Sequence, residues 1–249
     1  MKLNEQEIVD NWNKLILIIE SEFSGDRKQN LLKMYNHFET RMSIAPASGL
    51  IHYHNCFAGG YVDHILRVIE CSLLVWETWK KMGADPEDFT KEELMFSALN
   101  HDLGKAGDME HDYYIPNPSD WHRKNQGKLY AFNPELTHMS VPDRGLYLLN
   151  QFGIKYTERE CLAIRLHDGL YDQANEPYLK TYNPEKELKT YLPIMLHHAD
   201  HMASRIEHDM GVKGNKKVAP KTNSGYNKKK VVSDSKKSAQ ALLKGFFEE

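Results

Sequence analysis

An adjacent His-Asp pair, His101 and Asp102, closes an apolar run and is followed by Gly104 and Lys105. Neighbouring residues on a helix point in different directions, so a His and an Asp that bind one metal ion must lie where the helix ends and the chain turns. Gly104 permits such a turn. Neutral imidazole and carboxylate suit a borderline divalent ion, and the Lys105 ammonium can hold an anionic substrate against it. The pair therefore suggests metal-assisted hydrolysis of a phosphate ester.

Further His and Asp clusters are spread over the length of one domain. Most of them lie inside apolar helical patterns, where a buried charge is unfavourable unless it is paired. They comprise Asp63-His64, His138, His167-Asp168 and His197-His198-Ala199-Asp200-His201. This distribution favours shared metal ligands over unrelated surface and core histidines.

The order of these residues resembles that of the HD superfamily of metal-dependent phosphohydrolases. The segment from Ala45-Pro46-Ala47 through His54 and Gly59-Gly60 to His64 is more narrowly similar to the HD domain of YhaM-type bacterial 3′-to-5′ exoribonucleases. The similarity covers about residues 40 to 206. It implies an all-α HD-domain bundle that acts as a phosphohydrolase.

The resemblance also implies ligands for one or two divalent ions, among which Mn, Fe, Mg, Co, Ni and Zn are not distinguished. The ligands expected at a first ion are His64, His101, Asp102 and Asp200. A second ion is expected at His138 and His167, with Asp102 as the bridge. Hydrolysis would then use a metal-activated hydroxide.

Other roles follow for residues near these ligands. Asp102 is the expected catalytic carboxylate because it holds the ions, and Lys105 is expected to contact the substrate phosphate. Asp168 stands where the relatives have a second His, and it either accepts a hydrogen bond from a ligand imidazole or replaces a ligand. His198 is expected to support the site without binding metal.

Apolar residues repeat at helical spacing in three stretches of the chain. These stretches contain Trp12, Leu15, Ile16 and Ile19, then Val62, Ile65, Leu66, Ile69 and Leu73, and finally Leu192, Met195, Leu196, Ala199, Met202 and Ile206. No run of alternating β-branched residues between tight turns is visible, so the sequence predicts an all-α bundle with at most a short hairpin. We expect one domain over residues 1–211.

The helical pattern lapses between Ala106 and Glu135, in a stretch rich in aromatic and basic residues. A loop of this length is more often functional than not, and it begins directly behind the His-Asp pair. We therefore expect it to fold over the metal site. The side chains expected to stack on a base or contact a phosphate there are Tyr114, Trp121, Arg123 and Lys128. Alternatively, the aromatic residues only attach the loop to the body.

The net charge of −3 conceals an uneven distribution. Residues 212–249 hold ten Lys and three acidic residues, a net +7, so residues 1–211 carry −10. Such an acidic body is not typical of a protein that holds long nucleic acid by its phosphates. The three cysteines form no C-x-x-C pair, and the apolar run near Leu15 is too short and too acid-flanked for a signal peptide or membrane span. We expect a cytoplasmic protein.

From residue 212 the composition shifts to Lys, Asn, Ser and Gly, as expected for a flexible, disordered linker. Residues 240–247 match the Q-x-x-[aliphatic]-x-x-F-F peptide by which replication and repair proteins dock on PCNA-like sliding clamps. One helical turn would place Leu243, Phe246 and Phe247 on a single apolar face, with Gln240 hydrogen bonding beside it. The expected partner is such a clamp, and the alternative is a tail that folds back onto its own domain.

Three functions remain open on the sequence. A phosphodiesterase or 3′-to-5′ exonuclease on single-stranded nucleic acid is favoured by the YhaM-like segment, the aromatic loop and the clamp-like tail. A nucleotidase or (d)NTP triphosphohydrolase is favoured by the acidic body and by the lack of room for the N-terminal OB-fold of the relatives. A non-catalytic, clamp-associated protein is disfavoured because the ligand set is complete.

Overall fold

The computed structural model describes the backbone of residues 2–216 and the side chains of residues 2–211. Within these residues the chain forms nine α-helices, three short 3-10 turns labelled η1 to η3, and one two-stranded sheet. In chain order they are α1 (Glu5–Glu22), α2 (Gly25–Met42), α3 (Gly60–Lys81), α4 (Lys91–Asn100), η1 (Leu103–Ala106), β1 (Tyr114–Pro116), α5 (Asp120–Gln126), β2 (Tyr130–Phe132), α6 (Val141–Gln151), α7 (Glu158–Leu166), η2 (Gly169–Tyr171), η3 (Gln173–Asn175), α8 (Glu176–Leu179) and α9 (Leu192–Lys216). The prediction of an all-α bundle with at most a short hairpin is confirmed.

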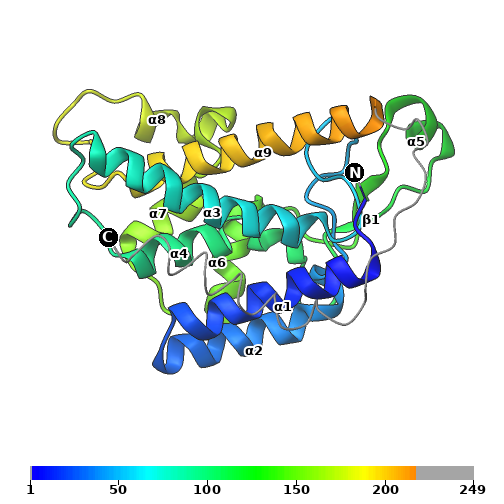
Figure 1. Cartoon of the computed structure of the whole chain (residues 1–249), viewed down its shortest axis with the longest axis horizontal. Helices are drawn as coiled ribbons and strands as arrows, with labels where there is room; N and C mark the ends of the chain where they lie inside the picture. Colours follow the sequence, from blue (N-terminus) through cyan, green and yellow to red (C-terminus); the bar gives the residue numbers. More distant parts are fainter. Residues whose placement is uncertain (1, 217–249) are drawn as a thin grey trace, which may run out of the picture.

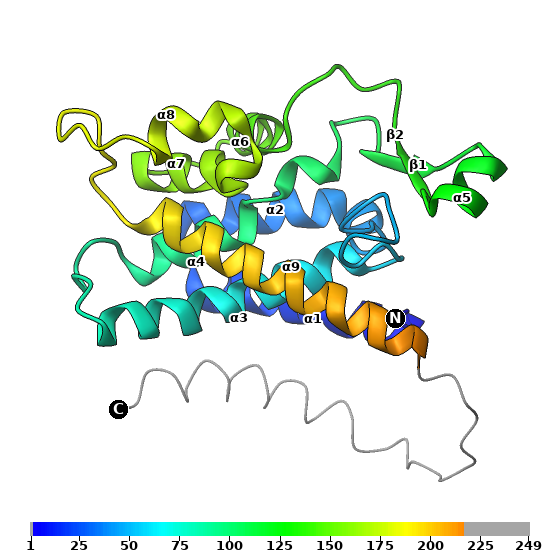
Figure 2. The same cartoon turned by 90° about the horizontal axis from the view of Figure 1, so that it is seen from above.

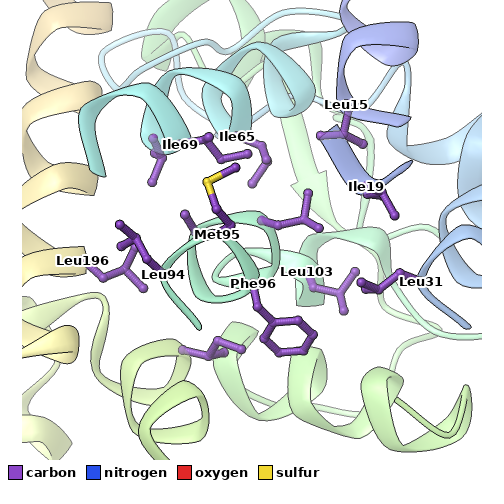
Figure 3. Packing of buried hydrophobic residues seen from close by; sticks show 14 of the residues in the cluster. Leu15, Ile19, Leu31, Ile65, Ile69, Leu94, Met95, Phe96, Leu103 and Leu196 are labelled. Carbon is purple, nitrogen blue, oxygen red and sulfur yellow. The ribbon is translucent and has the colours of Figure 1, made fainter. Parts of the chain in front are cut away.

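The helices surround α4, which lies in the middle of the bundle (Figure 1). The α1–α2 pair covers one side, α9 covers the other, and α9 packs along α3 and α7 (Figure 2). Every side chain of α4 from Glu93 to Asn100 is buried, which is typical of a helix enclosed on all sides. Figure 3 shows Met95 pointing toward Ile65 of α3, and Phe96 pointing the opposite way.

The central position of α4 places its C-terminal end deep in the molecule. The Tyr35 hydroxyl of α2 donates to the carbonyl of Leu99 at 3.0 Å, and the Asn100 amide donates to the carbonyl of Phe96 at 2.8 Å. Both contacts fix the last turn of the helix. The residues that follow this turn, His101 and Asp102, are therefore positioned by the core itself.

The apolar stripes predicted at helical spacing lie on α1, α3 and α9 and face the core, with one exception. Ile206 is 42% exposed, whereas the next residue, Glu207, is 3% exposed. The reason is that the Glu207 carboxylate reaches His64 on α3, so α9 turns this charged residue inward at the end of its stripe.

The long segment after η1 is ordered. β1 and β2 pair antiparallel, with Ile115 opposite Ala131, and α5 lies between them. A backbone bridge between Leu50 and Lys128 ties this hairpin to the loop before α3. The hairpin and α5 project from one end of the bundle (Figure 2).

At its C-terminal end α9 runs to Lys216, five residues into the segment that the composition predicts to be flexible. The rest of that segment, with Gln240, Leu243, Phe246 and Phe247, lies outside the described residues, so the clamp-binding peptide stays a prediction. No helix in the described part of the chain is long and apolar enough to cross a lipid bilayer.

Gly104 has a different role from the one that its position suggested. It does not adopt a positive φ, and the chain turns instead by tightening from α4 into the 3-10 turn η1. A Cβ on Gly104 would lie 2.1 Å from the carbonyl oxygen of Val141, at the start of α6. Gly104 is thus required for the close approach of α6 to the metal-site turn.

We expect Gly104→Ala to lower the free energy of unfolding by about 1–3 kcal/mol, because α6 must move away from η1. Urea denaturation measures the change. Gly211→Ala is the matched control, since Gly211 lies in α9 with negative φ and open space around it. The control should be neutral or gain up to about 1 kcal/mol. Equal stability of Gly104→Ala and the natural chain would contradict this role.

Candidate metal centre

Three buried imidazole rings converge from three different helices. His64 lies in the second turn of α3, whereas His101 and His167 directly follow the last residues of α4 and α7. The three side chains are 0–2% exposed. The Nε2 atoms of His64 and His101 are 3.4 Å apart, and the ring centroids of His101 and His167 are 4.9 Å apart.

His101 and His167 are each oriented by the same type of hydrogen bond to the backbone. In each case Nδ1 donates to the carbonyl oxygen three residues earlier, Ala98 or Ile164, at 2.8 Å. This hydrogen bond places the proton on Nδ1 and leaves the lone pair on Nε2, which faces the centre. A backbone carbonyl behind a ligand imidazole is the usual arrangement in metal sites.

Two carboxylates complete the cluster. Asp102 lies between the rings, with Oδ2 3.6 Å from His101 Nε2 and Oδ1 3.6 Å from His167 Nε2. Asp200 of α9 places Oδ1 3.2 Å from His64 Nε2. Among the described residues, three groups of ligand atoms lie close enough together to hold an ion. Two of them belong to this cluster, namely His64, His101 and Asp200, and His101, Asp102 and His167.

The charges within the cluster attract cations strongly. Burial alone lowers the pKa of His64, but Glu207 and Asp200 outweigh it and raise that pKa to about 10. Burial likewise opposes the charged form of His167, yet Asp102 and Asp168 raise its pKa to about 9. For His101 burial prevails and lowers the pKa to about 4. The neutral form of His101 is the form that binds a metal.

These residues fit a divalent ion. The atoms directed at the centre are imidazole Nε2 atoms and carboxylate oxygens. Without an ion, protons on His64 and His167 balance the buried carboxylates, as the raised pKa values of these two rings indicate, and a divalent ion would displace the protons from the same nitrogens. The buried carboxylates need positive partners of this kind. Lys105 neutralises one carboxylate, with Nζ 2.6 Å from Asp102 Oδ2. Mixed imidazole and carboxylate ligands suit Mn, Fe, Co, Ni or Zn.

Glu207 supports the centre and was not predicted from the sequence. Its carboxylate accepts from Nδ1 of His64 at 3.1 Å and also pairs with Nε of Arg67 at 3.2 Å. Glu207 thereby directs His64 Nε2 at the cluster, as the backbone carbonyls do for the other two rings. The available signal was its spacing, seven residues after Asp200 and on the same face of one helix.

His54 is a second residue that the sequence analysis did not assign to the site. Its ring lies 4.6 Å from that of His64, and its Nε2 is buried without a hydrogen-bond partner among the described residues. Burial, followed by the charges of His64 and Lys105, lowers the pKa of His54 to about 3. The third potential ligand group consists of His54, His64 and Glu207, but the Glu207 carboxylate already pairs with the Arg67 guanidinium.

Other predicted site residues lie outside the cluster. His138 is exposed before α6 and belongs to none of the potential ligand groups found in the described part of the chain, so its role as a ligand stays a prediction. Asp168 is 48% exposed, with Oδ1 3.8 Å from His167 Nε2, at the rim of the centre. His198 is exposed and packs its ring 5.7 Å from that of Trp79.

The predicted substrate-binding residues divide into two groups. Lys105 and Tyr114 lie near the centre: burial raises the pKa of Tyr114, and the Lys105 ammonium acts against that shift. The other three belong to the projecting hairpin segment. Trp121 is 59% exposed, Lys128 is exposed, and Arg123 donates to Asp120 and to the carbonyl of Asn117.

Addition of a divalent metal ion should stabilise the fold, because the ion binds the folded chain and not the unfolded chain. At a free metal concentration about 100 times Kd the gain is about 2.7 kcal/mol, or roughly 5–10 °C in Tm for a domain of this size. Differential scanning calorimetry with MnCl2 and with EDTA measures the shift. His101→Ala should lose most of it, while an equal shift in that variant would contradict the assignment.

The chain matches no family model, no curated protein and no solved structure with which it was compared. The structure itself shows a mostly helical protein with buried His and Asp clusters that can hold metal ions.

Proposed function

We propose that the chain is a metal-dependent phosphohydrolase of the HD type, which cleaves phosphodiester bonds of single-stranded nucleic acid or of a related nucleotide. The observation that supports this most is the convergence of His64, His101, Asp102, His167 and Asp200 at the ends or sides of four helices. Their order along the chain is the order that the sequence resemblance implies. A bound divalent ion would supply Lewis-acid charge and lower the pKa of a water molecule toward about 7.

The residues around the ion would then have different roles, which depend on their positions. Asp102 lies 3.6–3.7 Å from Nε2 of each of the three rings, and His101 is the residue that the two ligand groups share. Lys105 lies beside it; burial lowers the pKa of this amine, but the Asp102 charge outweighs burial and holds the pKa above its ordinary value. The ammonium therefore stays charged and can bind a phosphate oxygen.

Access to the centre is confined to one side. The rings of His64, His101 and His167 are buried, whereas the side chains of Lys105, Asp200 and Asp168 are 14%, 18% and 48% exposed. A phosphate that approaches over this rim would meet the ammonium and the ligand carboxylates together. Water reaches the other faces of the cluster poorly, so electrostatic contacts there are strong.

A nucleotidase or (d)NTP triphosphohydrolase is the second candidate, supported by the net charge of −10 on residues 1–211. That charge disfavours long nucleic acid more than a small nucleotide. A non-catalytic protein is the third, and it would leave the metal site without turnover.

Product analysis of the metal-loaded full chain separates these functions. The substrates are an end-labelled single-stranded oligonucleotide, a deoxynucleoside triphosphate, a deoxynucleoside monophosphate and bis-p-nitrophenyl phosphate. We expect stepwise release of mononucleotides from the oligonucleotide. Released phosphate or triphosphate from the nucleotides alone would establish the second candidate. No turnover of any substrate, in a preparation that binds metal, would overturn the proposed function. His101→Ala, purified identically, controls for contaminating nucleases.

A further inference from the structure

A cavity of 420 Å³ is formed by residues of η2, α8 and the first turns of α9. It is lined by Leu170, Tyr171, Leu179, Ile194, His197 and His198. None of these lining residues is Asp, Glu, Lys or Arg. The cavity thus suits an uncharged, largely apolar group.

Three rings form a platform at the mouth of this cavity. His197 and His201 stack with an interplanar angle of 25° and centroids 6.2 Å apart, one helical turn from each other on α9. The Tyr171 ring lies 5.8 Å from that of His201, and its hydroxyl lies 3.1 Å from His201 Nε2. Tyr171 is nevertheless 78% exposed, so most of its ring is accessible to a ligand from solvent.

The platform adjoins the metal centre through His167. Nδ1 of His197 donates to the carbonyl oxygen of His167 at 2.8 Å, which joins the cavity wall directly to a candidate ligand. A Cβ on Gly169 would lie 2.3 Å from the His197 ring, so the backbone after His167 packs closely against His197 in the cavity wall. Asp200 lies three residues after His197, on the same side of α9.

We propose that this cavity binds the nucleobase of a nucleotide whose phosphate lies at the metal centre. The inference rests on the proposed phosphohydrolase function and adds the part of the substrate that is recognised. A planar, uncharged heterocycle matches an apolar cavity with an open aromatic face, and base stacking on such rings tolerates any base. The exposed Asp168, between His167 and the platform in sequence, would lie beside the sugar-phosphate link.

This location differs from the aromatic loop that the sequence favoured. Trp121 and Arg123 belong to the projecting α5, where Arg123 is engaged with Asp120 and Asn117. Tyr171, by contrast, lies three residues after Asp168, whose carboxylate is 3.8 Å from a candidate ligand. The cavity by α9 is therefore linked directly to a candidate ligand, His167.

Two phosphodiesters that release the same p-nitrophenolate test the proposal on the metal-loaded full chain. Thymidine 5′-(p-nitrophenyl phosphate) carries a base, and methyl p-nitrophenyl phosphate does not. Tyr171→Ala should lower the ratio of their kcat/KM values roughly tenfold, mainly through KM of the base-bearing substrate. Tyr171→Phe keeps the ring and should keep the ratio within about twofold of the natural value. Tyr182→Ala, at a fully exposed tyrosine, is the matched control.

Equilibrium binding provides a readout that needs no turnover. Calorimetric titration with thymidine and with thymidine 5′-monophosphate should show Kd raised roughly tenfold by Tyr171→Ala and unchanged by Tyr182→Ala. If neither diester is hydrolysed but this pattern holds, the proposed function fails and the base site stands. If hydrolysis occurs and Tyr171→Ala changes neither ratio nor Kd, the base site is overturned.

The same site would accept the base of a free nucleotide or of a strand end, and competition identifies the source. Thymidine 5′-monophosphate and a thymidine oligonucleotide are compared as competitors against the base-bearing diester. Stronger competition by the oligonucleotide, weakened in Tyr171→Ala, supports the cavity as the site of a strand end. Stronger competition by the monophosphate, weakened in the same variant, supports it as the site of a free nucleotide. Competition by either compound that Tyr171→Ala leaves unchanged would overturn the cavity as the base site.

Discussion

Replacement of Asp102 by Ala is expected to reduce hydrolysis by roughly 10³-fold or more. Loss of a single preorganised electrostatic group reduces kcat by roughly 10²–10³-fold, and this carboxylate faces all three candidate ligand rings. Metal content should fall as well, because Asp102 belongs to one ligand group and lies 3.7 Å from His64 of the other. Steady-state kinetics with added Mn and metal analysis of the purified variant measure the two effects.

Two further variants show whether the effect belongs to the metal ligand. Asp102→Asn keeps the shape of the side chain and should lose activity like Asp102→Ala, which separates chemistry from folding. Lys105→Ala should mainly raise KM, because the ammonium contacts the phosphate without holding an ion. Full activity of Asp102→Ala in the presence of Mn would show that the chemistry lies elsewhere.

Arg27→Ala is expected to lower the free energy of unfolding by about 3–5 kcal/mol, the largest stability loss that we predict. Arg27 of α2 donates to both carboxylate oxygens of Glu160 in α7, at 2.7 and 3.0 Å, and to the carbonyl of Lys155. The Glu160 side chain is fully buried, so removal of Arg27 leaves a buried charge with the Thr157 N–H, at 2.7 Å, as its remaining close donor. The guanidinium also covers the ring of Phe96 at 4.6 Å.

Glu92→Gln provides the control, since the same guanidinium contacts Glu92 at 3.1 Å near the surface. Glu92 is 44% exposed, and a surface pair of this kind contributes about 0–1 kcal/mol. Urea denaturation of both variants measures the difference. A loss below about 1 kcal/mol in Arg27→Ala, the limit for a surface ion pair, would show that this pair does not hold α2 against α7.

Much of the fold followed from helical periodicity. The stripes around Leu15, Ile65 and Leu196 lie on α1, α3 and α9 and meet in one core. Such spacing is reliable because burial of an apolar face is a strong and local constraint. The hairpin of β1 and β2 could only be anticipated as a possibility, since three-residue strands leave no alternation to detect.

The site was less predictable where contacts between distant segments of the chain determine the role of a residue. The structure brings together residues from motifs that the sequence displays. His101, Asp102 and His167 follow the ends of α4 and α7, whereas His64 and Asp200 lie inside α3 and α9. Glu207 acts through a contact between α3 and α9 that no local pattern encodes. Gly104 was misinterpreted for the same reason: its neighbour Val141 is distant in sequence. Tyr171 gains its place only from the packing of η2 against α9.

The most direct test of the metal centre is anomalous diffraction from crystals of the full chain grown with Mn. We predict anomalous density among Nε2 of His64, His101 and His167 and the carboxylates of Asp102 and Asp200. His101 and His167 should keep their Nδ1 hydrogen bonds to Ala98 and Ile164. Density that lies elsewhere on the chain, or well-ordered rings with no density between them at saturating Mn, would contradict the centre and with it the proposed function.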